Sequence, residues 1–276
     1  MKMSILFIDV DGTLVDYEGK APESATIAIS KARENGHLVF LCTGRSKAEG
    51  YNQLLETVGF DGYIGANGGY IEFRQQPLSH HSLTESQCQE VVSWLTNRGL
   101  EFYLEGNEAL YASSGFKTRA PSTMQAYCQK KQIASQELEA LFPGMIFDGN
   151  LVYQGINKIS YILNSYQDFI DTKANFPNLE SHTWGGVLEE ALFGDLAVLD
   201  INKGLAVTEV CDYLQMDITD CYGFGDAKID IPMLDKCQYK IAMGNGGEEI
   251  KAVADYITSS VEEDGLYKAF AHYNLI

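Results

Sequence analysis

The sequence has few basic residues, few prolines and no long apolar run. Its 276 residues include 20 lysines and arginines against 38 aspartates and glutamates, so the formal net charge is −18 at pH 7. A field of that sign repels polyphosphate chains and anionic headgroups, which argues against nucleic-acid binding and against a membrane-surface role. No stretch approaches the roughly 20 apolar residues that cross a bilayer, and the first apolar run, broken by Asp9, is too short for a signal peptide. We therefore expect a cytoplasmic protein.

The sequence also lacks paired cysteines and the usual nucleotide-binding fingerprints. None of the 6 cysteines forms a C-x-x-C pair, and most lie in apolar runs, so we expect buried, reduced thiols and no disulfide framework. No G-x-x-x-x-G-K-[ST] segment occurs, and the G-F-G at 223–225 lacks the third glycine of a dinucleotide fingerprint. These absences exclude a P-loop and a Rossmann cofactor site.

Both ends of the chain alternate short apolar runs with amphipathic stretches. The pattern predicts strands and helices in turn at 4–10, 22–35, 37–43, 47–58, 63–66, 202–215, 219–225, 229–236, 239–243, 247–254 and from 262 onward. Such alternation is typical of βαβ units around a parallel sheet, with strands buried on both faces.

The middle of the chain has a different pattern. A helix is predicted over 84–98, because Thr84 and Gln87 form a capping-box pattern and Gly99 follows as a stop. The segments around it are richer in aromatics and alternate more, which favours an antiparallel sheet with one solvated face. We therefore predict a doubly wound α/β core built from residues 1–81 and 191–276, with an α+β domain inserted at 82–190.

Two carboxylates, Asp9 and Asp11, stand at the end of the first predicted strand. Residues at i and i+2 of an extended chain share one side, and in a doubly wound sheet that edge is where ligands bind. The two acids raise each other's pKa unless a cation lies between them, and Mg²⁺ takes hard oxygen ligands. One carboxylate could then attack phosphorus while the other protonates the leaving oxygen. The alternative is a polar turn, which Asp and Gly also favour.

Three more segments carry polar residues beside predicted strands and helices. Thr43 and Gly44 suit a phosphate, although Thr before Gly is also an ordinary helix N-cap. Lys203 could neutralise a phosphate or a carboxylate cluster, although most lysines are simply solvated. Asp226 and Asp230 share one helical face, although acids at a helix start are also favoured by its dipole.

Taken together and in this order, the four segments resemble the motifs of a known superfamily. The sequences ILFIDVDGTLVD, LVFLCTGR, INKGLAV and GFGDAKIDIPML resemble the four motifs of haloacid dehalogenase-superfamily phosphatases, and more narrowly of the Cof-type, sugar-phosphate-hydrolysing subfamily. ANGGYI, IAMGNGGEEIKAVADYIT and EEDGLYKAF are also similar to stretches of that subfamily. The likeness spans both ends of the chain, and an insertion between the second and third motifs is where the subfamily carries its α/β cap, of type IIB.

The resemblance implies a Mg²⁺ site formed by acids. Asp9 would be the nucleophile and a Mg²⁺ ligand, and Asp11 the general acid and base, binding the metal through its backbone carbonyl. Asp226 would be the third protein ligand, with Asp230 just outside as a support. The second acid, Asp11, favours phosphoryl transfer over dehalogenation, because an oxygen leaving group needs a proton and a halide does not.

The resemblance also implies a phosphate-binding set, with one departure. Thr43 and the Gly44 backbone would hold the phosphoryl oxygens, and Lys203 would steady the nucleophile and the phosphate. The fourth motif of the subfamily usually has Asn where this chain has Ile229, and Ile donates no hydrogen bond. Loss of one such contact costs on the order of 1–3 kcal/mol, so we expect a weaker or re-tuned site.

The resulting hypothesis is a Mg²⁺-dependent phosphatase that hydrolyses a small phosphorylated metabolite, a sugar phosphate or a phosphorylated cofactor, through an aspartyl-phosphate. The inserted cap would close over the substrate and set specificity. Two alternatives stay open: phosphomutase or phosphotransferase chemistry on the same scaffold, and a non-catalytic phospholigand sensor. We expect a monomer or a weak homo-oligomer.

Overall fold

A computed structural model describes residues 2–16, 18–49, 57–131, 137–186 and 188–276. The chain divides into two compact units, each of which is described by itself. Unit 1 comprises residues 1–44, 51–79 and 202–276, and unit 2 comprises residues 45–50 and 80–201.

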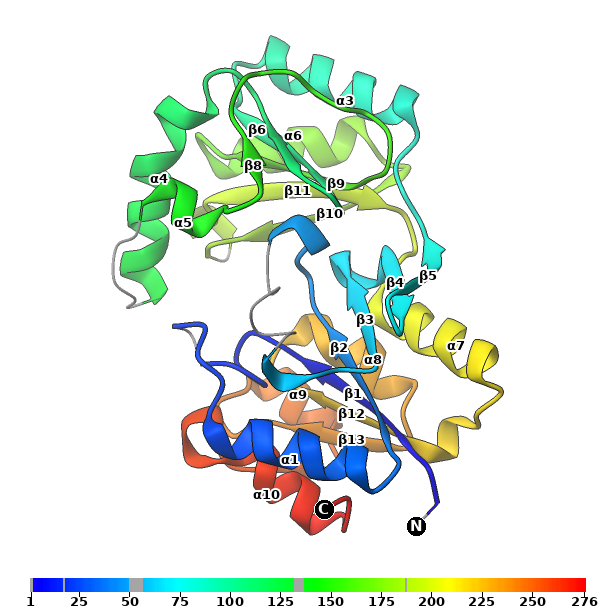
Figure 1. Cartoon of the computed structure of the whole chain (residues 1–276). Coiled ribbons are helices and arrows are strands. Elements are labelled where there is room, and N and C mark those ends of the chain that lie inside the picture. Colours follow the sequence, from blue (N-terminus) through cyan, green and yellow to red (C-terminus); the bar gives the residue numbers. More distant parts are fainter. Residues whose placement is uncertain (1, 17, 50–56, 132–136, 187) are drawn as a thin grey trace. The chain divides into compact units, whose positions relative to one another are not determined.

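Unit 1 is built on an eight-stranded, mainly parallel sheet (Figure 1). In spatial order its strands are β14 (Tyr256–Ile257), β13 (Tyr239–Ala242), β12 (Cys221–Gly225), β1 (Ile5–Asp9), β2 (Leu38–Cys42), β3 (Gly62–Gly65), β4 (Tyr70–Phe73) and β5 (Gln76–His80). The pairs from β14 to β3 are parallel, and β4 runs antiparallel to β3. Its helical segments are α1 (Glu23–Glu34), η2 (Ala66–Gly68), α7 (Lys203–Leu214), η4 (Ile218–Asp220), η5 (Lys228–Asp230), α8 (Ile231–Asp235), α9 (Glu248–Val253), η6 (Val261–Glu263) and α10 (Gly265–His272).

Helices cover both faces of this sheet, which explains why β2 is apolar throughout and β1 is apolar up to the Asp9 that ends it. Leu6 and Ile8 of β1 belong to a core shared with α1 and α10, whereas Ile5 and Phe7 belong to a core shared with α7 and α8. A strand with solvent on neither face needs no polar alternation, and every residue of β1 and β2 is buried.

The order of the strands brings the predicted site segments together. From β1 the chain adds β2 and β3 on one side of the sheet, and it later returns to place β12 and β13 on the other side. The connections therefore change direction between β1 and β12, and in open parallel sheets the crevice outside the carboxyl ends at such a point is where ligands bind. Asp9 is in register with Cys42, and Ile8 with Phe224, so the segments that follow β1, β2 and β12 begin at the same edge.

Unit 2 contains a separate six-stranded mixed sheet. In spatial order its strands are β10 (Leu179–Trp184), β11 (Phe193–Val198), β9 (Ile156–Ile162), β6 (Phe102–Gly106), β7 (Leu110–Ala112) and β8 (Met145–Ile146). All neighbours are antiparallel except β7 and β8. The helical segments are η1 (Lys47–Glu49), α3 (Glu85–Asn97), α4 (Phe116–Lys131), α5 (Leu138–Leu141), α6 (Tyr166–Asn175) and η3 (Leu188–Glu190).

One face of this second sheet packs against α3 and α6. The other packs against α4 and α5 and also buries polar groups, where a solvated face was expected. Glu105 is fully buried on that second face, where Ser160 and Ser46 donate hydrogen bonds to its two carboxylate oxygens and Lys158 lies 3.3 Å away. Burial, and next the charge of Glu49, raise the pKa of Glu105 to about 8. These polar side chains are buried because they satisfy one another.

The fold confirms the predicted α/β class with an inserted α+β unit. The capping box of Thr84 and Gln87 is present at the start of α3, as expected. The helix predicted over 47–58 lies partly outside the described residues. Unit 2 also includes residues 191–201, because β11 pairs with β9 and β10, and the domain bounds of 82–190 stay a prediction. In the described part of the chain, no helix is long and apolar enough to span a membrane.

Two isoleucines of α1 differ in burial, and we expect their replacement to affect stability differently. Ile29 is fully buried in the core of unit 1, whereas Ile27 on the same helix is 42% exposed. We expect Ile29→Ala to lower the free energy of unfolding by about 2–5 kcal/mol, because it leaves a cavity. The same change at Ile27 should stay within about 0.5 kcal/mol. Urea denaturation of both variants measures the difference, and equal losses would contradict the packing described for α1.

Candidate active site

Asp9 is the last residue of β1 and is held by a lysine from another part of the chain. It is 7% exposed, and its Oδ1 accepts a hydrogen bond of 2.6 Å from Lys203 Nζ. Its Oδ2 makes no hydrogen bond with the residues that the structure describes. One carboxylate oxygen is thus fixed in direction while the other stays available for chemistry.

Lys203 is the first residue of α7 and is almost completely buried, at 1% exposed. The Asn202 side chain caps the helix by accepting from the backbone N–H groups of Gly204 and Leu205. The ammonium donates to Asp9 Oδ1 at 2.6 Å, to Asp230 Oδ1 at 2.6 Å and to the backbone carbonyl of Cys42 at 3.1 Å. An ammonium has three N–H donors, so the protein itself uses all of them. Burial works to lower the pKa of Lys203, but the charges of Asp230 and Asp9 outweigh it and raise the pKa above its ordinary value.

Asp230 connects Lys203 with the loop that follows β12. While its Oδ1 binds the ammonium, its Oδ2 accepts from the backbone N–H groups of Asp226 and Ala227, at 3.2 and 3.1 Å. Gly225 fits here because a Cβ at that position would lie 2.7 Å from the Cβ of Asp230. Both oxygens of Asp230 are therefore engaged by the protein, and the residue orients its neighbours.

The turn after β1 packs directly against Asp226. Gly12 has a φ of +92°, and a Cβ there would collide with the Asp226 carboxylate. The Thr13 hydroxyl donates to Asp226 Oδ1 at 3.4 Å, and Asn245 Nδ2 donates to the Gly12 carbonyl at 2.8 Å. The glycine of the first motif is thus required for close approach of the two loops.

Three acids meet at this edge of the sheet. Ligand oxygens of Asp9, Asp226 and Asp230 lie within 4.8 Å of one another, and all three residues are buried. Burial, and next the charge of Asp230, raise the pKa of Asp9 well above its ordinary value and raise that of Asp226 to about 7. When ionised, three carboxylates beside one ammonium leave two negative charges in excess. The hard oxygen donors and this excess fit a divalent cation such as Mg²⁺.

Four of the predicted site residues lie together, and Asp11 is not one of the clustered acids. Asp9, Lys203, Asp226 and Asp230 form one connected cluster. The side chain of Asp11 is partly exposed and is not among the three clustered acids, although its charge contributes to the raised pKa of Asp226.

The other two predicted residues, Thr43 and Gly44, follow β2. Thr43 is buried, its N–H donates to the Ile64 carbonyl at 2.8 Å, and its own carbonyl accepts from Asn67 N–H at 3.0 Å. The Cys42 carbonyl, one residue earlier, is the third acceptor of Lys203. The backbone before Thr43 is thus tied to the acid cluster.

Sequence reasoning missed several residues that shape this site. Thr13 and Asn245 hold the loops through single hydrogen bonds, and Asn67 holds the Thr43 backbone. The only sequence signals for them were the D-G-T and ANGG segments and the glycines after Met243, which mark turns but not partners.

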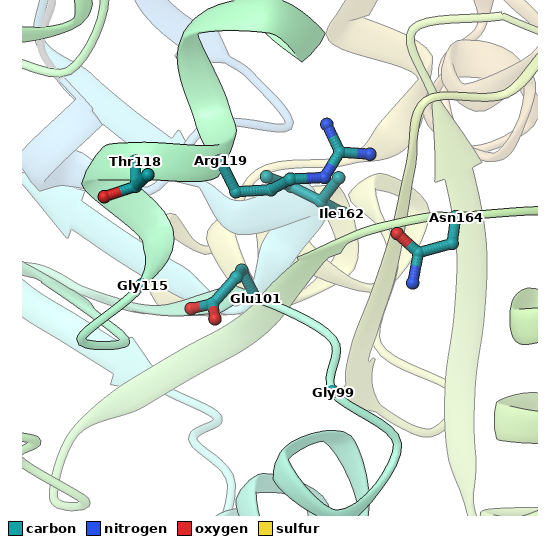
Figure 2. Close-up of a pocket in the computed structure, with 7 residues that line it drawn as sticks. All are labelled: Gly99, Glu101, Gly115, Thr118, Arg119, Ile162 and Asn164. Atoms are coloured by element: carbon teal, nitrogen blue, oxygen red, sulfur yellow. The ribbon is translucent and has the colours of Figure 1, made fainter.

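Unit 2 has a cavity of its own, of about 470 Å³ (Figure 2). Its lining includes Glu101, Arg119 and Asn164, with Gly99, Gly115, Thr118 and Ile162. Ser113 donates to the Glu101 carboxylate, and Arg119 donates to the hydroxyls of Ser122 and Thr123. Glu101 and Arg119 thus have hydrogen-bond partners on the same unit, and none of the clustered aspartates lines this cavity.

Comparison with known proteins identifies the class. The family model for haloacid dehalogenase-like hydrolases matches residues 6–270. YkrA of Bacillus subtilis (strain 168) is 26% identical over 276 residues, covering 100% of both chains. The 5-amino-6-(5-phospho-D-ribitylamino)uracil phosphatase YwtE of the same organism is 24% identical over 282 residues, covering 96% of both chains. The solved structure of the subclass IIB sugar phosphatase BT4131 matches with a TM-score of 0.77 at 22% identity, covering 99% of this chain and 100% of that one.

The chain belongs to the haloacid dehalogenase-like hydrolases, as the four motifs predicted. Within that family its fold is that of the Cof-type, subclass IIB members, and it is an enzyme of the phosphatase class.

The raised pKa of Asp226 predicts how a cation stabilises the protein. Its pKa of about 7 in the folded chain exceeds its ordinary value of 3.8, so the metal-free fold loses stability as the pH rises through that range. A divalent cation that replaces the proton removes this loss. We expect MgCl₂ to raise the melting temperature, relative to EDTA, by several degrees at pH 8 and by little at pH 5. In Asp226→Asn the difference between the two pH values should shrink, and equal MgCl₂ effects at both pH values in the wild type would contradict the interpretation.

Proposed function

We propose that this enzyme is a Mg²⁺-dependent phosphatase that hydrolyses a small phosphate monoester through an aspartyl-phosphate on Asp9. The proposal depends on the burial and the hydrogen bonding of the Asp9 carboxylate. Its carboxylate is buried at the carboxyl end of β1, Lys203 fixes one oxygen, and the other makes no hydrogen bond with the described residues. A carboxylate held in this way is a positioned nucleophile.

In the first step an oxygen of Asp9 attacks phosphorus as the ester P–O bond breaks, and the departing oxygen takes a proton from Asp11. In the second step a water gives a proton back to Asp11 and attacks the aspartyl-phosphate, which releases inorganic phosphate and regenerates Asp9. The partial exposure of Asp11 suits this role, because its proton must reach both substrate and water.

The remaining residues bind charge and keep the nucleophile in place. Thr43 and the backbone N–H of Gly44 would bind phosphoryl oxygens, and Lys203 supplies positive charge while it orients Asp9. Asp230 acts through Lys203 and the Asp226 loop, which its two oxygens hold.

The cation would be held by Asp9, Asp226 and the backbone carbonyl of Asp11. When bound, it supplies a Lewis acid that neutralises charge on the transferred phosphoryl group. The acids fit that role because they are buried and because one lysine offsets only part of their charge.

The substrate class is proposed from relatives and from the net charge. YwtE acts on a phosphoribitylamino-uracil and BT4131 is a sugar phosphatase, both of which point to phosphate esters of small polyhydroxylated molecules. The net charge of −18 disfavours polyanionic partners. We therefore propose a sugar phosphate or a phosphorylated cofactor or its precursor, and not a nucleic acid or a membrane lipid.

Replacement of the nucleophile tests the mechanism. Asp9→Asn should lower kcat for an aryl phosphate by roughly a thousandfold or more, because a carboxamide does not attack phosphorus. The exposed Asp212→Asn on α7 is the matched control and should retain full activity. Release of phosphate in MgCl₂ measures both, circular dichroism checks the fold, and EDTA should silence the wild type. Turnover that survives either Asp9→Asn or EDTA would refute the mechanism.

Product analysis distinguishes the hydrolase from a phosphomutase. A hydrolase releases one inorganic phosphate per ester consumed, whereas a mutase or phosphotransferase yields an isomeric or new phosphate ester. A screen over phosphorylated sugars, nucleotides and cofactor precursors, read out as free phosphate, therefore tests both the reaction and the substrate class.

The exposed Ile229 predicts a gain of activity. Its side chain is 41% exposed, within the short η5 segment between Asp226 and Asp230. Ile229→Asn should raise kcat/KM for an aryl phosphate by about tenfold, because it adds one hydrogen-bond donor beside the reacting group. Ile218→Asn is the matched control, since Ile218 is 51% exposed in the similar η4 segment. An unchanged or lower kcat/KM in Ile229→Asn would show that a hydrogen-bond donor at this position does not assist the reaction.

A further inference from the structure

The ANGG segment, at residues 66–69, forms a turn that the proposed mechanism does not yet use. Ala66, Asn67 and Gly68 all have left-handed backbones, with φ of 50°, 55° and 106°. Left-handed conformations at consecutive residues other than glycine are costly and persist where surrounding contacts impose them. Here Asn67 N–H donates to the Thr43 carbonyl, and a Cβ on Gly68 would lie 2.5 Å from the Asn202 carbonyl oxygen. The turn therefore packs closely against both the residue that follows β2 and the residue that precedes α7.

The Asn67 side chain has one carboxamide atom without a hydrogen-bond partner among the described residues. Its Oδ1 is buried and has no hydrogen-bond partner in the described part of the chain. A Cβ on Gly44 would lie 3.0 Å from that oxygen and 3.5 Å from Nδ2, so the carboxamide lies against Gly44. A buried carboxamide edge without a partner is costly, and such groups are rare unless another molecule binds them.

Among the described side chains, Lys203 and Ile229 add no unused N–H group to the donors proposed at Thr43 and Gly44. All three N–H groups of Lys203 are bound to Asp9, Asp230 and the Cys42 carbonyl, and Ile229 has none to offer. A transferred phosphoryl group spreads its charge over three oxygens that need preorganised donors. A carboxamide presents its N–H₂ or its oxygen to the same place by rotation about its last bond, so the edge beside Gly44 is able to donate to an anion.

We propose that Asn67 is a further substrate-binding residue, whose carboxamide donates a hydrogen bond to a phosphoryl oxygen beside Gly44. This inference rests on the proposed phosphatase function and adds a binding group to it. The strained turn would then preorganise the binding site, since it holds the carboxamide against Gly44 before substrate binds. A neutral donor also suits a site rich in carboxylates, because a second lysine or arginine would pair with the aspartates.

The test uses substitutions that separate binding from folding. Asn67→Gly removes the carboxamide, and glycine adopts a left-handed backbone without steric cost. Asn67→Asp keeps the shape of the side chain but replaces the donor by a negative charge. Asn274 is the matched control position, since it also has a left-handed backbone, with φ of 54°, and is exposed near the C-terminus. Each variant is assayed with an aryl phosphate in MgCl₂, and inorganic phosphate is used as a competitive inhibitor.

We expect Asn67→Gly to raise the inhibition constant of inorganic phosphate and the KM by about tenfold, with an unchanged or higher melting temperature. Asn67→Asp should raise them further at pH 8, because the new carboxylate repels the phosphate. The same changes at Asn274 should alter neither constant.

Two results would overturn the inference while leaving the phosphatase function intact: normal phosphate affinity in Asn67→Gly, or a loss of affinity that only follows a fall in melting temperature. A wild type without phosphate release would instead contradict the proposed function itself.

Discussion

The arrangement of the site depends on one buried ammonium. Lys203 lies between Asp9 and Asp230 and reaches the Cys42 carbonyl, so it joins the ends of β1 and β2 to the loop after β12. Without it, three buried acids would repel one another with no protein cation between them. The same contact engages one oxygen of Asp9 and leaves the other without a hydrogen bond among the described residues, which is the arrangement that the proposed nucleophile requires.

Much of the fold was predictable, for a physical reason. The strands of the first sheet are covered on both faces, so Ile5 to Ile8 and Leu38 to Cys42 needed to be apolar, and that pattern is visible in the sequence. Parallel strands present their carboxyl ends at one edge, so acids after β1 and β12 could be expected to meet. The polar residues that follow those strands were therefore recognisable as candidates.

Other features could not be predicted because they depend on distant partners. Nothing local to Asp230 shows that its two oxygens bind Lys203 and two backbone N–H groups, and nothing local to Asn67 shows that its carboxamide lies against Gly44. In unit 2 the buried Glu105 looks, from its neighbours in sequence, like a solvent-facing residue of an alternating strand. The extent of unit 2 along the chain depends on distant partners in the same way, since β11 joins this unit through its pairing with β9 and β10.

The discontinuous course of unit 1 along the chain affects the order in which the protein is assembled. β1 is made first, yet its neighbour β12 belongs to the last part of the sequence, whereas the strands from β6 to β11 are contributed by one continuous stretch. Contacts between distant segments form slowly, and domains made of continuous sequence fold as units during synthesis. A growing chain therefore completes the inserted sheet before β12 is available to pair with β1, and the proposed catalytic centre cannot form until Lys203, Asp226 and Asp230 have left the ribosome.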